Sequence, residues 1–127
     1  MTSETAKLPK LVVNGIDHVV LHVRDVERAE RFYVDVLGFE VAHGGGGHTF
    51  LRCGDQMVAL FERGDDIHAG AEMNHLALRL AAADYDEVKA VLEAEGIEVT
   101  GRPGDDRCIY FRDPDGHRLQ LLTPGEH

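Results

Sequence analysis

The chain contains two stretches that match one another, Asp17-His18-Val19-Val20-Leu21-His22-Val23 and Asn74-His75-Leu76-Ala77-Leu78-Arg79-Leu80. The second begins 57 residues after the first. Both alternate apolar side chains with a second set that includes histidine, and this period of two is typical of a half-buried β-strand. Because both place a histidine directly after Asp or Asn, we interpret them as the first strands of two copies of one module.

Three more matches follow in the same order: residues 38–41 with 96–99, 50–52 with 110–112, and 58–61 with 119–122. Their spacing grows from 58 to 61 residues, as small loop insertions would cause. Any single match is weak evidence, but four in the same order indicate an internal duplication.

Each copy predicts a strand, a helix and then three strands. In the first copy a strand at 16–24 is followed by Asp25, which can cap a helix that ends at Gly38. In the second copy Asp84 and Glu87 form a capping-box pattern, and Gly96 ends the helix. The remaining strands are expected at residues 39–43, 47–54, 56–63, 97–101, 106–112 and 117–123, with a hairpin turn at 113–116.

This order predicts an α+β fold in which two tandem βαβββ modules form a U-shaped, mostly antiparallel sheet around a concave cleft. A chain of 127 residues is long enough for one such domain. Residues 1–12 are expected to form a mobile tail and residues 13–127 the domain, with modules at 14–64 and 72–124.

The composition excludes several classes of function. Asp and Glu outnumber Lys and Arg by 23 to 13, and this formal charge of −10 argues against nucleic acid as a partner. No apolar run approaches about 20 residues, the length that crosses a bilayer. The polar first ten residues hold no apolar signal-peptide core, so we expect a cytoplasmic protein. Two cysteines, Cys53 and Cys108, are too few for a disulfide scaffold.

Strand alternation places four equivalent positions of the two copies in one layer: His18, Ala59, His75 and Gln120. The pseudo-twofold relation between the copies would bring these positions toward one point. Two imidazoles and an amide oxygen can bind a divalent metal ion, so His18, His75 and Gln120 are candidate metal ligands. The alternative for each histidine is a hydrogen-bonded strand residue, and for Gln120 a polar group that holds water or a ligand.

Other residues of this layer can contact a small ligand. Aromatic residues can supply apolar walls, a histidine can act as a general base, and arginines can hold an anionic group. The alternatives are a partly exposed histidine at a strand end and solvated arginines at the rim. The candidates are Phe50, Phe61 and Tyr110 for the walls, His22 as the base, and Arg79 and Arg118 for the anion. The remaining histidines lie in or beside predicted loops or the tail, so we expect surface positions for His43, His48, His68, His117 and His127.

These elements resemble the vicinal oxygen chelate superfamily, which includes glyoxalase I, methylmalonyl-CoA epimerase, extradiol dioxygenases, fosfomycin-resistance enzymes and bleomycin-binding proteins. The resemblance covers residues 14–124. One fold hosts many reactions in this superfamily, so its motifs indicate the fold more specifically than the chemistry. The motifs are Ile16-Asp17-His18, Arg31-Phe32-Tyr33, Leu37-Gly38-Phe39, Asn74-His75-Leu76 and Tyr110-Phe111-Arg112-Asp113-Pro114-Asp115-Gly116.

The resemblance implies a site for Mn, Fe, Ni, Zn or Co, with His or Gln on the first strand, His on the fifth and Glu on the eighth. His18 and His75 match two of these ligands, whereas Gln120 replaces Glu, and Ala59 replaces the fourth ligand of lyases and epimerases. Without a carboxylate the site should bind a cation less tightly, which disfavours extradiol dioxygenase, glyoxalase I and epimerase chemistry. Glu62 could supply the carboxylate only through a bulge, because regular alternation turns it to the opposite layer.

Three functions remain open. The first is a metal-dependent enzyme (a lyase, isomerase, dioxygenase or transferase) whose cation acts as a Lewis acid on a small oxygenated metabolite or electrophile. The second is a metal-free protein that binds a drug or metabolite as the bleomycin-resistance proteins do, and the charge of −10 suits a cationic ligand. The third is a structural role, which the polar layer of the sheet disfavours.

Two further features bear on these functions. Asn74-His75-Leu76-Ala77 and Ile109-Tyr110-Phe111 also resemble the fosfomycin-modifying enzymes, although no cluster of Ser, Lys and Arg marks a phosphonate site. The resemblance to the superfamily also implies a homodimer, which would cover the edges of a U-shaped sheet.

Overall fold

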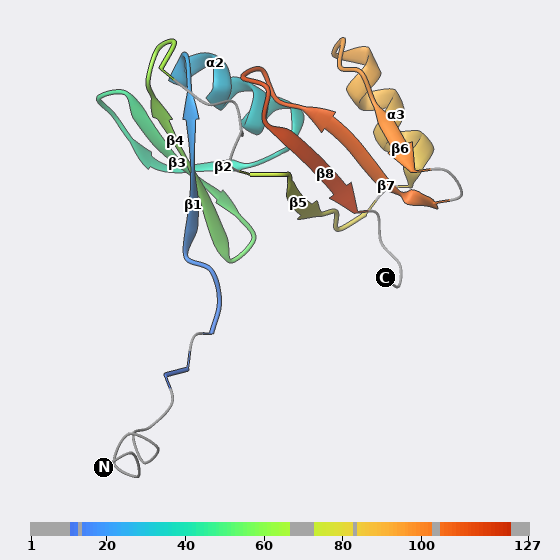
Figure 1. Ribbon diagram of the computed structural model, residues 1–127, viewed down its shortest axis with the longest axis horizontal. Coiled ribbons are helices and arrows are strands. Elements are labelled where there is room, and N and C mark those ends of the chain that lie inside the picture. The colour runs from blue at the N-terminus through green and yellow to red at the C-terminus, as the bar shows by residue number, and fades with distance from the viewer. Residues whose placement is uncertain (1–10, 13, 67–72, 83, 103–104, 123–127) are drawn as a thin grey trace.

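The computed structural model describes residues 11–12, 14–66, 73–82, 84–102 and 105–122. It contains two four-stranded sheets, one in each copy of the repeat (Figure 1). The strand order is β1-β4-β3-β2 in the first sheet and β5-β8-β7-β6 in the second. The strands are β1 (His18–Val23), β2 (Glu40–Gly44), β3 (His48–Cys53), β4 (Gln56–Glu62), β5 (Leu76–Arg79), β6 (Thr100–Arg102), β7 (Asp105–Arg112) and β8 (Arg118–Leu122).

Strand pairing is equivalent in the two sheets. β1 runs parallel to β4 and β5 runs parallel to β8, whereas the other two pairs of each sheet are antiparallel. Parallel strands need a crossover connection, and each module has a helix between its first and second strands. The predicted α+β fold of two tandem βαβββ modules is therefore confirmed. Among the described strands the sheet is divided in two, since no pairing joins one module to the other.

Side chains cap both helices at their first turns. α2 (Val26–Arg31) follows Asp25, whose Oδ1 accepts two backbone hydrogen bonds at 2.9 and 3.2 Å. α3 (Tyr85–Ala94) follows a complete capping box between Asp84 and Glu87, with bonds of 2.9 and 3.1 Å. Both caps agree with the sequence pattern. No helix in the described ranges is long and apolar enough to span a membrane.

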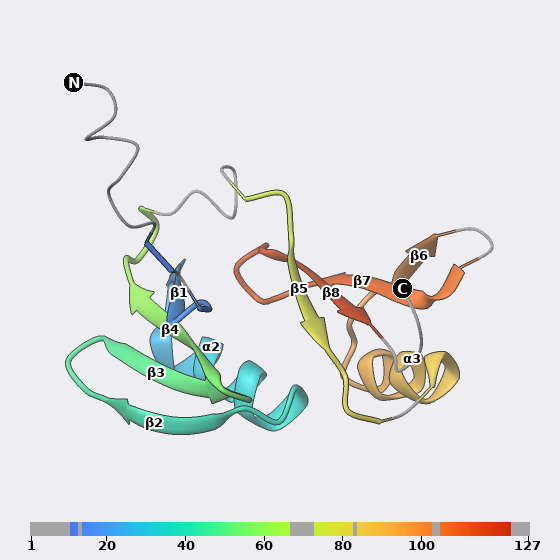
Figure 2. The same ribbon diagram turned by 90° about the horizontal axis from the view of Figure 1, so that it is seen from below.

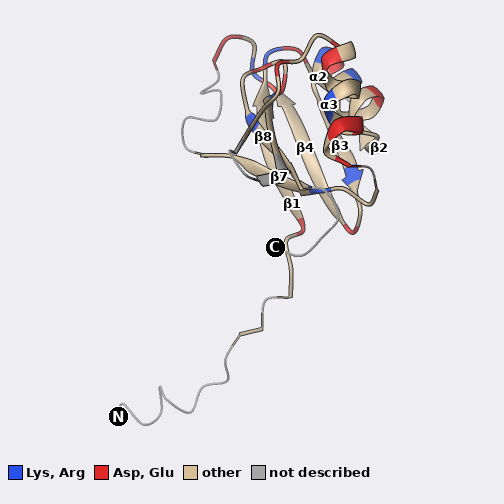
Figure 3. Cartoon of the chain, turned by 90° about the vertical axis from the view of Figure 1, so that its right-hand side faces the viewer, with Lys and Arg blue, Asp and Glu red and all other residues tan. Residues whose placement is uncertain are grey.

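Alternate strand residues build the core beneath the helices. Leu21 of β1 and Leu78 of β5, which occupy matching positions, are both buried, and so are Leu60 of β4 and Leu121 of β8. Acidic and basic residues lie along the two helices (Figure 3). The predicted apolar layer is thus confirmed. We call the opposite layer of each sheet, which contains His18 in the first module and Ala77 in the second, the open face.

The first helix differs from the prediction at its end. Instead of continuing regularly to Leu37, α2 passes into a π-helical segment, η1 (Phe32–Val36), whose turns are wider. Phe32 and Tyr33 are both buried there, and the Phe32 ring lies 6.4 Å from that of Phe111 in the second module. The end of this helix therefore packs against the other module. The periodicity of the helix sequence does not predict that contact, which accounts for the difference.

A buried carboxylate, Asp113, joins the two modules. Its Oδ2 accepts a hydrogen bond from the Tyr33 hydroxyl at 2.8 Å and contacts His117 Nδ1 at 2.7 Å. Its Oδ1 accepts the backbone N–H groups of Asp115 and His117 at 3.0 and 2.8 Å. Asp113 is 5% exposed, so these bonds replace the water that a charged group would otherwise need. The sequence predicted a surface position for His117, and this is wrong, because the Asp113 carboxylate draws its ring inward.

The second carboxylate of the same turn, Asp115, extends this junction. Its Oδ1 accepts the Arg24 backbone N–H at 2.8 Å and lies 3.0 Å from Arg28 Nη2. The Asp115 side chain is fully buried, whereas both arginine side chains are partly exposed. The predicted hairpin turn therefore also anchors the second module to the start of α2.

We expect Tyr33→Phe to lower the free energy of unfolding by about 1–3 kcal/mol, because a buried carboxylate loses a hydrogen-bond donor. Urea unfolding at neutral pH measures this loss. Tyr85→Phe is the matched control, since the half-buried Tyr85 makes no side-chain hydrogen bond with the described residues. Equal losses in the two variants would contradict a special role of the Tyr33 bond.

Stability should also fall at alkaline pH through the same tyrosine. Burial, and then the negative charge of Asp113, raise the pKa of Tyr33 well above the usual value of 10.0. Above about pH 10 the unfolded chain loses this proton while the folded chain keeps it, so unfolding becomes more favourable as pH rises. We expect the urea midpoint to decline above about pH 10, and to decline less in Tyr33→Phe. Parallel curves for the two proteins would show that Tyr33 does not titrate in this way.

Candidate functional site

The open face of the first sheet places His18 beside aromatic residues. The His18 and Phe50 ring centres are 5.3 Å apart in an edge-on contact. Ala59 lies between their strands, paired with Phe50 on one side and with Val20 on the other, and its side chain is fully buried. The position that the resemblance assigns to a fourth metal ligand is therefore occupied by a small, buried apolar side chain, which cannot bind a metal ion.

The residue before each candidate histidine orients its ring. His18 Nδ1 lies 2.8 Å from Asp17 Oδ2, and His75 Nδ1 lies 2.8 Å from Asn74 Oδ1. An ionised carboxylate and an amide oxygen only accept hydrogen bonds, so each Nδ1 donates, and in the neutral imidazole the lone pair is then on Nε2. Such a partner on the far nitrogen is the usual support of a metal-binding histidine. The duplication thus preserves both the histidine and its orienting group.

The open face of the second sheet surrounds Tyr110. Its ring centre is 5.9 Å from that of His75, and the Arg118 guanidinium lies 4.2 Å above it. Gln120 pairs with Tyr110 on β7 and with Ala77 on β5, and it is only 6% exposed. His75, Tyr110, Arg118 and Gln120 thus form one half of the candidate site.

The single chain leaves the two halves on separate sheets. The rings near His18 belong to the first module, and those near His75 to the second. β1 and β5 also lie apart in Figures 1 and 2. Within the described residues, no group of three or more His, Cys, Asp or Glu side chains is placed to hold a metal ion.

The other predicted residues lie on strands at the surface. His22 is exposed on β1, where it pairs in register with Phe61. Arg79 is exposed on β5 and forms no ion pair with the described residues. Both are accessible to a ligand, and neither side chain forms a hydrogen bond or ion pair with the described residues. Cys108 lies on β7, and the placement of its side chain is outside the described residues.

Glu62 serves the helix rather than the open face. Its Oε1 accepts the Val26 backbone N–H at 3.0 Å, at the first turn of α2. The β1–β4 register is regular through Glu62, which faces Val23, so no bulge turns it toward His18. The carboxylate that the predicted metal site lacks is therefore not supplied by Glu62.

We expect Glu62→Ala to lower the free energy of unfolding by about 0.5–1 kcal/mol, because the helix terminus loses an acceptor and a favourable charge. Urea unfolding measures this, and elemental analysis should show an unchanged metal content. Glu93→Ala on the exposed side of α3 is the control. A loss of bound metal in Glu62→Ala alone would assign Glu62 to the site.

Sequence reasoning missed two histidines on the first open face. The sequence places His43 and His48 beside loops and favours surface positions. His43 is exposed and His48 partly exposed, and their rings stack on Phe50 and Phe61 at 4.6 and 5.3 Å. For His48 the signal was present, because it lies two residues before Phe50 on one strand. For His43 it was not, since a bulge between Val41 and His43 shifts the register of β2.

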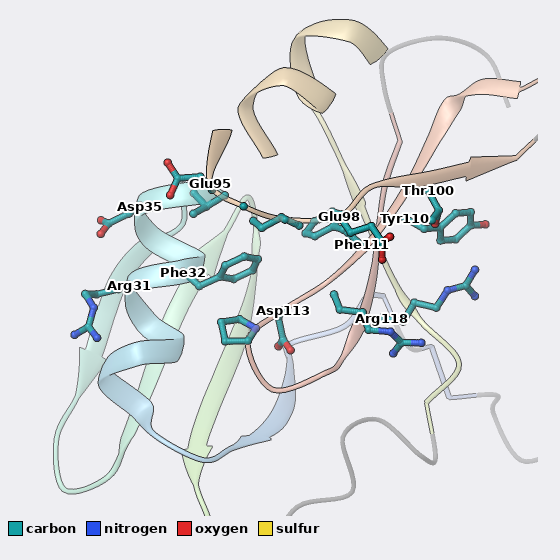
Figure 4. Close-up of a pocket in the computed structure, with 15 residues that line it drawn as sticks. Arg31, Phe32, Asp35, Glu95, Glu98, Thr100, Tyr110, Phe111, Asp113 and Arg118 are labelled. Atoms are coloured by element: carbon teal, nitrogen blue, oxygen red, sulfur yellow. The ribbon is translucent and has the colours of Figure 1, made fainter. Parts of the chain in front are cut away.

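Two cavities lie between the modules. One, of about 700 Å³, extends from Arg31 of α2 and Asp35 of η1 to Tyr110 and Arg118, which belong to the second half of the candidate site (Figure 4). The other, of about 730 Å³, is bordered by η1, β5 and α3 and includes Cys53. Burial raises the pKa of the Cys53 thiol, which disfavours the nucleophilic thiolate. None of His18, His75 and Gln120 lines either cavity.

A model of the glyoxalase/bleomycin resistance protein/dioxygenase superfamily matches residues 15–121. The chain belongs to this superfamily. The resemblance identified from the sequence motifs is thereby confirmed, and with it the fold of the two modules. Membership in this superfamily does not specify the reaction, because its members share an architecture rather than one chemistry.

Two bacterial proteins are similar to this chain over most of its length. A virulence protein of Salmonella typhimurium is 30% identical over 123 residues, covering 88% of this chain and 85% of that protein. The metallothiol transferase FosB of Staphylococcus epidermidis is 27% identical over 120 residues, covering 87% and 82%.

Solved superfamily structures have the same fold. The fosfomycin resistance protein FosX of Listeria monocytogenes superposes with a TM-score of 0.76 at 25% identity, covering 90% of this chain and 94% of that one. A mutant of that protein, with a TM-score of 0.74 and 22% identity, was solved with Mn(II) and a dihydroxypropylphosphonic acid.

Proposed function

We propose that this protein is a metal-dependent enzyme that acts on a small oxygenated or electrophilic substrate. The observation that carries the proposal is the matched pair of histidines, each with Nδ1 bound to the preceding side chain and with no hydrogen bond from Nε2 to the described residues. A histidine kept only for packing has no need of this arrangement in both copies. The names of the relatives, a metallothiol transferase and a fosfomycin resistance protein, support the same class of activity.

His18 and His75 would hold the metal ion through Nε2, and Gln120 through its side-chain oxygen. All three ligands are neutral, so they leave the charge of a divalent cation uncompensated. We therefore expect the substrate to contribute an anionic oxygen to the site. When bound, the metal polarises an oxygen of the substrate as a Lewis acid. Mn, Fe, Zn, Ni and Co are all compatible with two imidazoles and an amide oxygen.

The chain's own residues would bind and orient the substrate. Arg118, packed on the Tyr110 ring, presents a guanidinium beside Gln120 that can bind an anionic group. Arg79 on the same face can add a second positive charge. His22 lies on the strand of His18 and can accept a proton from the substrate or from an attacking nucleophile.

The complete site is proposed to form across a homodimer. In one chain His18 and His75 belong to separate sheets. We infer that the first half of one copy meets the second half of another. A twofold axis would then create two equivalent sites, each with His18 from one chain and His75 from its partner copy. Pairing the two open faces would also exclude water from the bound substrate.

A metal-free binding protein of the bleomycin-resistance type is the second candidate function. Ala59 and Gln120 favour it, because both replace a metal ligand that the resemblance implies. The formal charge of −10 would attract a cationic drug or metabolite. In this case the two open faces would bind the ligand through their aromatic side chains alone.

We expect tag-free protein from metal-supplemented medium to contain close to one transition-metal ion per chain. His18→Ala and His75→Ala should each lose it, because either change removes one of two imidazole ligands. When these two variants are co-expressed, random pairing makes about half of the dimers mixed, and each mixed dimer has one intact site. Elemental analysis should then find about a quarter of the wild-type metal content in the co-expressed protein.

Each alternative gives a different result in this experiment. A site within one chain would leave the co-expressed variants without metal. That result would contradict the shared site but not the proposed enzyme function. Wild-type protein without metal would contradict the enzyme proposal. Thermal stabilisation of that protein by basic natural products would then support the binding function.

A further inference from the structure

Four rings on the open face of the first sheet form a continuous array, which we call the ring array: His43, His48, Phe50 and Phe61. His43 stacks on Phe50 with an interplanar angle of 25°, and His48 stacks on Phe61 with an angle of 20°. Phe50 meets Phe61 edge-on at 6.1 Å and 76°. Stacked and edge-on contacts are the favoured geometries of aromatic pairs, so each ring holds its neighbours in place.

The backbone keeps this array at the surface. Thr49 and Leu51 alternate with the array residues along β3, and both are buried on the helix side. Phe50 pairs with the small, buried Ala59, which leaves room for the rings to meet above it. Phe50, Phe61 and His48 are each partly exposed, and His43 is exposed. The sheet thus presents an aromatic surface that is ordered before any ligand arrives.

Hydrogen-bond donors border the array, and the carboxylates of Asp17 and Glu62 already have hydrogen-bond partners. The Arg63 guanidinium lies 6.0 Å from the centre of the Phe61 ring, and each imidazole can donate at least one N–H. Asp17 contacts His18, and Glu62 accepts the Val26 N–H. A ligand on this surface therefore meets π faces and donors, which suit a flat group that carries anionic oxygens.

We propose that the ring array binds the planar, conjugated part of the substrate, so that the substrate is an aromatic or conjugated compound bearing anionic oxygens. The inference rests on the proposed metal site, because Phe50 also contacts His18 at 5.3 Å. Oxygens held near His18 would place an attached ring against Phe50 and His43. A flat ring can stack there over its whole face, whereas a branched alkyl group touches it at a few atoms.

The test compares two phosphonates that differ in the shape of the attached group, phenylphosphonate and tert-butylphosphonate. Each is titrated calorimetrically into the Mn(II)-loaded full-length protein. We expect phenylphosphonate to bind about tenfold more tightly, the effect of a well-formed aromatic contact. In the His43→Ala/His48→Ala double variant the ratio should fall to about twofold or less. Val41→Ala is the matched control, since Val41 is exposed on the same strand but faces away from the array.

Metal content separates the failure of this inference from the failure of the proposed function. If the protein holds Mn(II) and shows no preference for the phenyl group, the ring array does not select the substrate. The same conclusion follows if the double variant keeps that preference. If the protein holds no Mn(II), the proposed enzyme function fails, and the titrations are repeated without metal. A phenyl preference that is lost in the double variant would then still support the ring array, and its absence would overturn the inference.

Discussion

The buried carboxylate of Asp113 is the interaction on which the arrangement of the two modules depends. It accepts hydrogen bonds from Tyr33 of the first module and from the turn of the second, where His117 also contacts it. A carboxylate left in this place without its partners would carry the full cost of a buried charge. The hydrogen bonds of Asp113 therefore fix the position of one module relative to the other, whereas apolar packing alone would permit small shifts between them.

This fixed relation matters because the candidate site is divided. Asp113 binds the turn of the second module to η1, and Asp115 binds it to α2, on the helix side of the first module. The open faces that carry His18 and His75 remain available for another copy of the chain. A rigid junction would then let a dimer place two imidazoles from different chains at one metal ion, a geometry that tolerates errors of only a few tenths of an ångström.

The two departures from the superfamily pattern, Ala59 and Gln120, lie on the open faces of the two sheets. Ala59 removes a ligand and leaves space over which Phe50 and Phe61 meet. Gln120 removes a negative charge from a largely buried position. In the proposed enzyme the oxygens of the substrate would neutralise the cation in place of these ligands, and its ring would stack on the open face of the first sheet. In a metal-free binding protein the same two residues would leave the open faces to an organic ligand.

The sequence by itself determined the duplication, the helix caps at Asp25 and Asp84, the apolar layer, and the matched positions of His18, His75 and Gln120. These features are local or periodic, so spacing and residue type are sufficient to predict them. Only the tertiary structure decided the π-helical segment at Phe32, the burial of His117, the position of Glu62 at α2, and the inclusion of His43 in the ring array. Each of these depends on a partner distant in sequence or on a bulge that shifts the register, and neither leaves a periodic signal in the chain.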